Sequence, residues 1–109
     1  MLIDFSKVQT EVVPHARGGE GEFHRQCVET GDNKIILGRL APGSTIGYHS
    51  HDEDSETIYI LSGTGRSMCD GVYEPLKPGD SQHCPKGHSH NLENTGSEDL
   101  VIFAVIPRQ

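Results

Sequence analysis

Five of the seven histidines fall in two short clusters, and imidazole is the commonest metal-binding group among side chains. The clusters are His49 with His51, and His83 with His88 and His90. Alternate residues of a strand share a face, so His49 and His51 should project to the same side, and Glu56 can return beside them after a short turn. A β-barrel can bring a histidine of the second cluster to the same spot. Three imidazoles and one carboxylate suit a borderline divalent ion such as Mn, Fe, Co, Ni or Zn.

Glycine, proline and asparagine flank both clusters at fixed spacings. Residues 43–63 read GSTIGYHSHDEDSETIYILSG, and residues 79–94 read GDSQHCPKGHSHNLEN. The first segment fits the pattern G(X)5HXH(X)3,4E(X)6G and the second fits G(X)5PXG(X)2H(X)3N, so the two resemble both halves of the cupin signature. The resemblance implies an all-β fold, the double-stranded β-helix or jelly-roll cupin barrel. It also implies that one divalent transition-metal ion is bound by His49, His51, Glu56 and His90.

The rest of the chain has the elements that such a barrel needs. Short apolar runs rich in β-branched residues alternate with Gly, Pro, Asp and Asn roughly every 8 to 12 residues, which is typical of sandwiches and barrels. The predicted strands are residues 23–28, 34–40, 45–51, 56–61, 65–69, 81–84, 88–93 and 100–106. Asp70-Gly71 predicts a hairpin turn between residues 69 and 72.

The length of 109 residues fits one domain, residues 1–109, and residues 1–30 would supply an N-terminal arm and the first strands. Residues 1–13 read as a strand or arm, with Pro14 tolerated at a sheet edge. Small single-domain cupins commonly form homodimers by lending such strands to a partner sheet. The resemblance therefore implies a homodimer whose arms cover exposed edges.

Composition argues against several classes of partner. The net charge is −7 and the nine basic residues are scattered, so neither nucleic acid nor an anionic membrane is expected to bind. No apolar run approaches a membrane span, and no secretory signal is visible, which favours the cytoplasm. Cys27, Cys69 and Cys84 are odd in number, so reduced thiols are expected. They read as small, partly buried hydrophobic residues, with a catalytic thiol as the minor alternative.

Several side chains near the two motifs are candidates for chemistry. His88 should share a face with His90 and is a candidate general base, or a turn histidine in solvent. Arg39 follows Ile35 and Leu37 on one strand face, so it either points inward, where it would need an anionic partner such as a carboxylate substrate, or reaches solvent from the end of the strand. If it points inward, it is a candidate for catalysis or substrate binding. Tyr48 is a further candidate for catalysis or substrate binding, and His83 for substrate binding. The acidic run 52–54 either rims the pocket or forms a solvated turn.

Three functions remain open. A six-coordinate ion with four protein ligands has two open positions, which suits a metal-dependent enzyme of the dioxygenase, decarboxylase or isomerase type acting on a small molecule, perhaps a carboxylate. The alternative is a barrel that binds or senses a small ligand without catalysis. The third is a structural protein braced by its metal. An open cavity of roughly 300 Å³ or more is expected for the first two, and a plugged barrel for the third.

Overall fold

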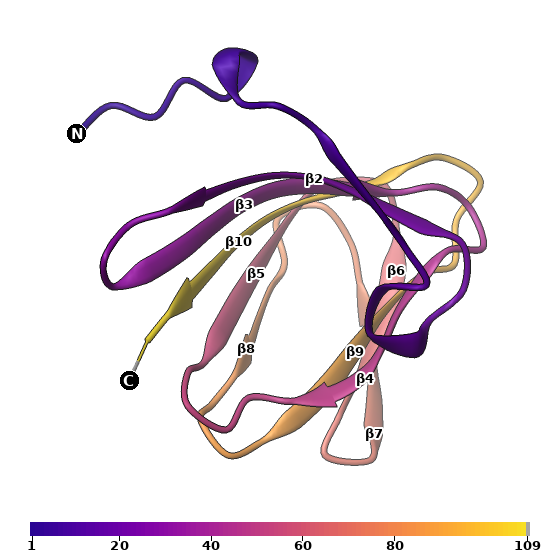
Figure 1. Cartoon of the computed structure of the whole chain (residues 1–109). Helices are drawn as coiled ribbons and strands as arrows, with labels where there is room; N and C mark the ends of the chain where they lie inside the picture. The colour runs from indigo at the N-terminus through magenta and orange to yellow at the C-terminus, as the bar shows by residue number, and fades with distance from the viewer. Residues whose placement is uncertain (109) are drawn as a thin grey trace.

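Two antiparallel sheets face each other across the interior of the molecule (Figure 1). A computed structural model describes residues 1–108. The six-stranded sheet has the order β1-β2-β3-β10-β5-β8, and the four-stranded sheet has the order β4-β9-β6-β7. Within the described residues the strands are β1 (Glu11–Pro14), β2 (Glu22–Glu29), β3 (Asn33–Leu40), β4 (Thr45–Ser50), β5 (Glu56–Ser62), β6 (Gly65–Cys69), β7 (Val72–Leu76), β8 (Ser81–Cys84), β9 (Ser89–Asn94) and β10 (Leu100–Pro107). This is the predicted double-sheet jelly roll.

The predicted strands agree closely with the observed ones. Strands β6 and β8 coincide with the predicted ranges 65–69 and 81–84, and the other predicted ends lie within two residues of the observed ones. The hairpin between β6 and β7 turns at Asp70 and Gly71, as predicted, and both residues have positive φ. Of the predicted N-terminal segment, only β1 pairs with a neighbouring strand, and it forms an outer edge of the six-stranded sheet.

The core lies between the sheets and follows the alternation of the strands. In β5, Glu56, Ile58 and Ile60 are buried while Thr57, Tyr59 and Leu61 are exposed, so Glu56 shares its face with the core, as the sequence predicted. Partners from both sheets complete the hydrophobic cluster, among them Ile36, Leu40, Leu92, Leu100, Ile102 and Ala104. A carboxylate on this face needs a polar or ionic partner, because burial of an unpaired charge is costly.

The fixed glycines and asparagine of the two motifs have structural roles. Gly43, Gly63, Gly79 and Gly87 all have φ between +81° and +92°, a region that favours glycine. At Gly63 an added Cβ would also overlap the Asp99 carbonyl oxygen.

Asn94, the last fixed residue, is buried. Its Nδ2 donates to the carbonyl oxygens of Leu40 and Glu98, both at 2.8 Å. Its Oδ1 accepts from the Gly96 amide, so this side chain ties the turn after β9 to the end of β3.

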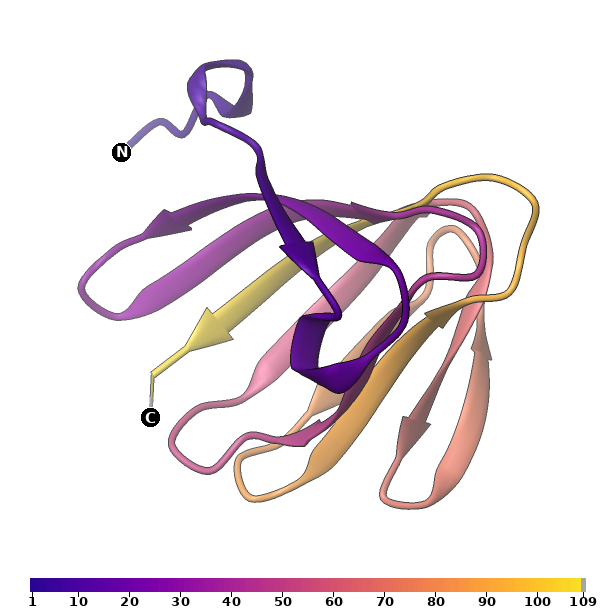
Figure 2. The same cartoon turned by 45° about the vertical axis from the view of Figure 1, so that its right-hand side comes forward.

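A short 3-10 turn (Ala16–Gly18, η2) packs against β4, and it is the indigo coil next to the magenta strand in Figure 2. It can approach because Gly47 lacks a side chain, and a Cβ there would overlap the Arg17 carbonyl oxygen. A second 3-10 turn (Phe5–Lys7, η1) lies outside the barrel, where Phe5 packs edge-on against Phe103 of β10. Neither turn, nor any other helix in residues 1–108, has the length and apolar content to span a membrane.

Candidate metal centre

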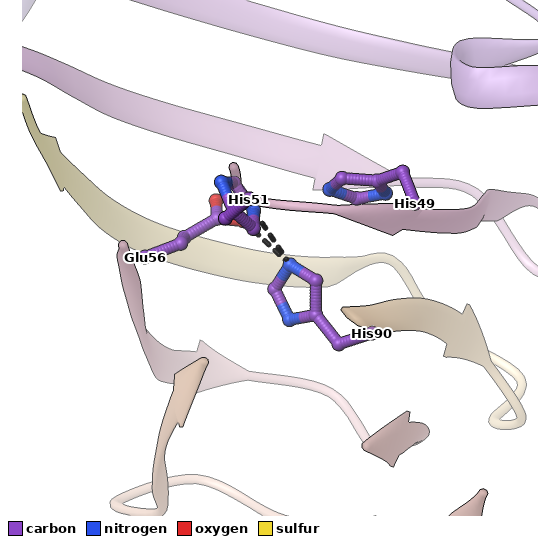
Figure 3. A group of neighbouring side chains, drawn as sticks. All are labelled: His49, His51, Glu56 and His90. Atoms are coloured by element: carbon purple, nitrogen blue, oxygen red, sulfur yellow. Dashed lines mark hydrogen bonds and ion pairs between the residues drawn. The ribbon is translucent and has the colours of Figure 1, made fainter. Parts of the chain in front are cut away.

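Four side chains from three strands and one loop converge between the sheets (Figure 3). His49 lies in β4, His51 lies just beyond its end, Glu56 begins β5, and His90 lies in β9. His49 and His90 are direct partners across the β4–β9 pair. The His51 amide donates to the His88 carbonyl oxygen at 2.9 Å, which holds the end of β4 against the turn before β9. The two motifs are thus brought together as the sequence predicted.

A bulge in β4 sets the direction of His49. The register of β4 against β9 shifts between Ile46 and His49, so three residue steps on β4 match two on β9. Both Ile46 and His49 consequently face the interior, although an odd number of steps separates them. Gly47 lies within this bulge, and its carbonyl oxygen accepts a hydrogen bond from His49 Nδ1 at 2.7 Å.

The three imidazole rings surround a common centre with nearly equal spacing. Their centroids are 5.0 Å, 4.8 Å and 5.0 Å apart, and the ring planes cross at 62° to 68°. Each Nδ1 faces an oxygen that only accepts: the Gly47 carbonyl at 2.7 Å, the Asp54 carboxylate at 2.6 Å and the Gln82 amide oxygen at 3.1 Å. Each Nδ1 must therefore carry a hydrogen, and in a neutral ring the Nε2 lone pair is left free for a ligand.

The distances between the free donor atoms fit a single ion. His51 Nε2 lies 3.0 Å from His90 Nε2, and Glu56 Oε1 lies 3.1 Å and 2.8 Å from these two nitrogens. Ligands on adjacent corners of an octahedron with bonds of 2.0–2.2 Å are roughly 3 Å apart. All four candidate donor atoms lie within 4.8 Å of one another. The cluster therefore suits a metal ion.

The surroundings of Glu56 favour its charged form despite burial. Burial alone would raise its pKa, but when the metal-free rings of His51 and His90 are protonated at Nε2, their hydrogen bonds and positive charge outweigh burial and lower the pKa of Glu56 to about 2. The hydrogen bond to Glu56 raises the pKa of His51, with a smaller contribution from Asp54. Burial lowers the pKa of His49, which has no carboxylate partner of this kind. The site thus combines a carboxylate with imidazoles whose proton a metal ion can replace.

The metal cluster forms one wall of a cavity of about 140 Å³. The cavity is smaller than the roughly 300 Å³ expected, but the barrel is not plugged, and the exposed side chains of Arg17 and Lys34 contribute to its lining. Apolar residues form most of the remaining wall, including Val13, Phe23, Ile36, Ile46, Leu92 and Ile106. A cavity of this size suits a small molecule beside the cluster.

The inward-facing arginine is Arg25, and the expectation that Arg39 points inward is wrong. On β3 the buried residues are Ile36, Gly38 and Leu40, so Arg39 lies on the outer face, 3.8 Å from Asp99. The prediction for Arg39 was wrong because three consecutive residues, Ile35, Ile36 and Leu37, are all apolar. The sequence therefore does not show whether the odd-numbered or the even-numbered residues of this strand face the interior. On β2, Arg25 lines the cavity.

The other candidates for catalysis or substrate binding also lie outside the cavity. Tyr48 points outward from β4 and is 51% exposed. His83 is exposed on β8, with Nδ1 2.9 Å from the Thr57 hydroxyl. His88 does not share the buried face of His90, because it belongs to the turn before β9 and bonds the Asp70 carboxylate at 2.5 Å. None of the three is among the residues that line the cavity in the described part of the chain.

The cysteines have the surroundings of unreactive thiols. All three are free within residues 1–108, with Cys84 fully buried and Cys27 and Cys69 partly so. Burial is the main cause that raises the pKa of each thiol, to about 12 for Cys84. A thiolate nucleophile is disfavoured under these conditions.

Three residues at the site were not identified from the sequence as site residues. Arg25 lies between Phe23 and Cys27 on one face of a predicted strand. Strand alternation could therefore have predicted that Arg25 faces the interior together with these two apolar residues. Asp54 belongs to the acidic run that reads equally well as a solvated turn, yet its carboxylate bonds His51. Gln82 has no sequence signal, because its contact with His90 depends on how β8 faces β9 across the barrel.

Comparisons with known proteins agree with the fold. The model of the family described as Cupin domain matches residues 36–106. The chain is 38% identical over 112 positions to the oxalate-binding protein of Thermotoga maritima, covering 97% of this chain and 93% of that protein. A crystal structure of a predicted oxalate decarboxylase from Thermotoga maritima has a TM-score of 0.94 and 33% identity, and the match covers 100% of both chains. A cupin-superfamily sugar phosphate isomerase from Silicibacter pomeroyi has a TM-score of 0.80 at 21% identity, covering 100% of this chain and 76% of that one, which shows the fold alone.

Proposed function

Because the chain belongs to the Cupin domain family, we propose that its four-residue cluster binds one divalent transition-metal ion and that a small carboxylate is bound beside this ion. The proposed ligands are His49, His51, Glu56 and His90. When bound, the ion supplies positive charge to which a carboxylate oxygen can coordinate. The ion is of the borderline class, Mn, Fe, Co, Ni or Zn, because the donors are three imidazoles and one carboxylate.

Arg25 is the observation that carries the carboxylate part of the proposal. Its Nε is buried and has no hydrogen-bond partner within the described residues, and its Nη2 lies 3.8 Å from Glu11. A buried guanidinium N–H without a partner is costly, and a carboxylate is the anion that matches its planar geometry. Since Arg25 lines the same cavity as the metal cluster, one small ligand can contact both.

The charge around the cavity supports the same class of ligand. The chain has a net charge of −7, yet three of its nine basic residues line this cavity, namely Arg17, Arg25 and Lys34. Among the described residues that line it, Glu56 is the single acidic side chain, and it belongs to the metal cluster. Arg25 and Lys34 also lie 3.8 Å from the exposed carboxylates of Glu11 and Glu29. The cationic side chains in the cavity wall nevertheless favour an anionic ligand over a cationic one. The name of the relative in Thermotoga maritima, an oxalate-binding protein, makes oxalate the first ligand to test.

The test is calorimetric titration of oxalate into the protein loaded with Mn²⁺ and into the same protein stripped of metal. We expect one oxalate per chain in the loaded protein and no measurable binding in the stripped one. Acetate, which has a single carboxylate, serves as the matched ligand control and should bind more weakly. Equal binding of oxalate with and without metal, or none to the loaded protein, would refute the proposal.

Turnover of the bound ligand is the second candidate. It is favoured by the two coordination positions that four protein ligands leave open on a six-coordinate ion. Decarboxylation converts oxalate and a proton into formate and carbon dioxide, so formate production by the loaded protein would identify an enzyme. A dioxygenase would instead consume oxygen, and an isomerase would conserve the composition of its substrate. If oxalate binds tightly but no formate forms, no oxygen is consumed and no isomer appears, the protein binds or senses its ligand without catalysis.

We also propose that the protein is a homodimer in the cytoplasm. Met1 and Leu2 are 95% and 93% exposed at the end of an arm that extends beyond the barrel (Figure 1). Tyr59 and Leu61 are exposed on the outer face of the six-stranded sheet, where a second copy would bury them. Residues 11–14 already pair with β2, and residues 5–8 contact Phe103 and Gln26 of the same chain, so residues 1–4 are the part available to reach a partner. The free thiols fit a reducing compartment.

A further inference from the structure

Gln82 lies behind His90, on the side away from the cavity. It occupies β8 and is 6% exposed, and its Oε1 lies 3.1 Å from His90 Nδ1. The same oxygen is 2.9 Å from the hydroxyl of Ser67, which is fully buried and also contacts the Asn91 carbonyl oxygen. Gln82 is absent from the residues that line the metal cavity, so it does not contact a ligand placed there.

The orientation of the Gln82 amide determines which nitrogen of His90 carries the hydrogen. With Oε1 toward the ring, Nδ1 must donate, and the Nε2 lone pair points at His51 and Glu56. With the amide turned over, its NH2 group would donate to Nδ1, the ring hydrogen would move to Nε2, and that nitrogen could not bind a metal ion. The observed orientation leaves Gln82 Nε2 buried without a hydrogen-bond partner anywhere in residues 1–108. Such an unsatisfied donor is unfavourable. The Ser67 hydroxyl has one hydrogen, so this orientation of the amide is favoured when that hydrogen and His90 Nδ1–H are both donated to Gln82 Oε1 rather than when Ser67 donates to the Asn91 carbonyl oxygen.

We propose that Gln82 is a positioning residue that fixes the Nδ1–H tautomer of His90 and so holds its Nε2 lone pair toward the metal cluster. The role of this tautomer in metal binding rests on the proposed metal site, but the tautomer itself does not require a bound metal ion. His49 and His51 do not need such a residue, because the Gly47 carbonyl and the Asp54 carboxylate fix their tautomers. Of the three rings, only His90 relies on a side chain that could present either a donor or an acceptor.

Nitrogen-15 spectroscopy of the metal-free protein at alkaline pH tests the tautomer directly. We expect His90 Nδ1 to give the shift of a protonated nitrogen and Nε2 that of a bare one. In Gln82→Met, which removes the acceptor at similar volume, the two tautomers should mix. A neutral His90 ring that carries its hydrogen on Nε2 at alkaline pH in the natural protein would overturn the inference. This measurement is decisive even if the protein binds no metal, so it can fail or succeed separately from the proposed function.

Metal affinity gives the second readout, with Co²⁺ as the probe in competition with a chromophoric chelator. We expect Gln82→Met to bind Co²⁺ roughly 10- to 100-fold more weakly, as for other residues that orient a metal-binding histidine. Gln82→Glu retains an acceptor for Nδ1–H and should restore the affinity. Ser67→Ala keeps the Gln82–His90 hydrogen bond, so its loss of Co²⁺ affinity should be smaller than that of Gln82→Met. Undiminished Co²⁺ affinity in folded Gln82→Met, or equal losses in the Met and Glu variants, would contradict the role.

Discussion

His51 Nε2 and His90 Nε2 lie 3.0 Å apart, although the Nδ1–H of each ring is already bonded to an oxygen of Asp54 or Gln82. Two nitrogen lone pairs at this distance repel unless a cation lies between them. Glu56 Oε1 adds negative charge within 3.1 Å of both nitrogens. A proton can occupy this position in the metal-free protein, and a divalent ion can replace it. The cluster is therefore arranged around a cation.

Asp54 should matter for metal binding although it is not a proposed ligand. Its carboxylate accepts from His51 Nδ1 at 2.6 Å and fixes both the tautomer and the direction of the ring. We expect Asp54→Ala to weaken Co²⁺ binding roughly 10- to 100-fold. Asp52→Ala is the matched control, because Asp52 is exposed in the same turn and lies near Ser50. Equal affinities of the two variants in the chelator competition would contradict this role.

Arg25 should determine carboxylate affinity, and Arg39 provides a matched comparison on the adjacent strand. Removal of a hydrogen bond to a charged ligand costs about 2 kcal/mol, so Arg25→Leu should bind oxalate roughly 30-fold more weakly in calorimetry. Arg39→Leu removes the same charge from the outer face and should change the affinity less than about twofold. If both variants lose affinity to the same extent, general charge rather than direct contact would explain the binding.

Gly47 should be needed for the packing of η2 against β4. A methyl group there would overlap the Arg17 carbonyl oxygen, so Gly47→Ala should lower the free energy of unfolding by about 1–3 kcal/mol in urea titrations. At Gly31 an added Cβ would meet no atom within 4 Å, so Gly31→Ala should change stability by about 0.5 kcal/mol or less. A Gly47→Ala protein as stable as the natural one would show that the turn can move away without cost.

The proposed homodimer predicts a sedimentation mass of twice the 11.9 kDa of one chain. The double change Tyr59→Lys/Leu61→Lys places charges on the outer face of the six-stranded sheet and should shift the mass to that of a monomer. Val72→Lys, at a 64% exposed position on the other sheet, should leave the dimer intact. A natural protein that sediments at about 12 kDa at all concentrations would refute the dimer.

The sequence predicted the fold and the convergence of the four metal-site residues because both depend on local spacing. Alternation gives His49 and His51 a common face and places Glu56 on the core face of β5, and the fixed glycines mark where strands must turn. The bulge between Ile46 and His49 was not predicted, because it depends on pairing with β9. His49 and His51 still share a face, since the bulge precedes both of them.

Residues beyond the motifs were predicted less well, and the arginines illustrate the physical reason. A strand with apolar residues on both faces, such as residues 35–37, does not indicate which face is interior, so Arg39 was placed inward and Arg25 was overlooked. For His88 the alternative of a turn histidine in solvent is confirmed, and the expectation that it shares a face with His90 is wrong, because the strand begins at Ser89 and His88 turns toward Asp70. Contacts such as Gln82 with His90 are tertiary and have no local pattern in the sequence.

The metal content of the protein, purified without a histidine tag or chelator, tests the central claim most directly. The natural sequence should carry close to one equivalent of a transition metal per chain. The His49→Ala/His90→Ala double variant should carry almost none while keeping the circular dichroism spectrum of a β-barrel. If this variant does not fold, His49→Ala alone is the substitute, since His49 is only partly buried. Absence of metal from the natural protein even after reconstitution, or full metal content in a folded variant, would contradict the assignment of these residues as ligands.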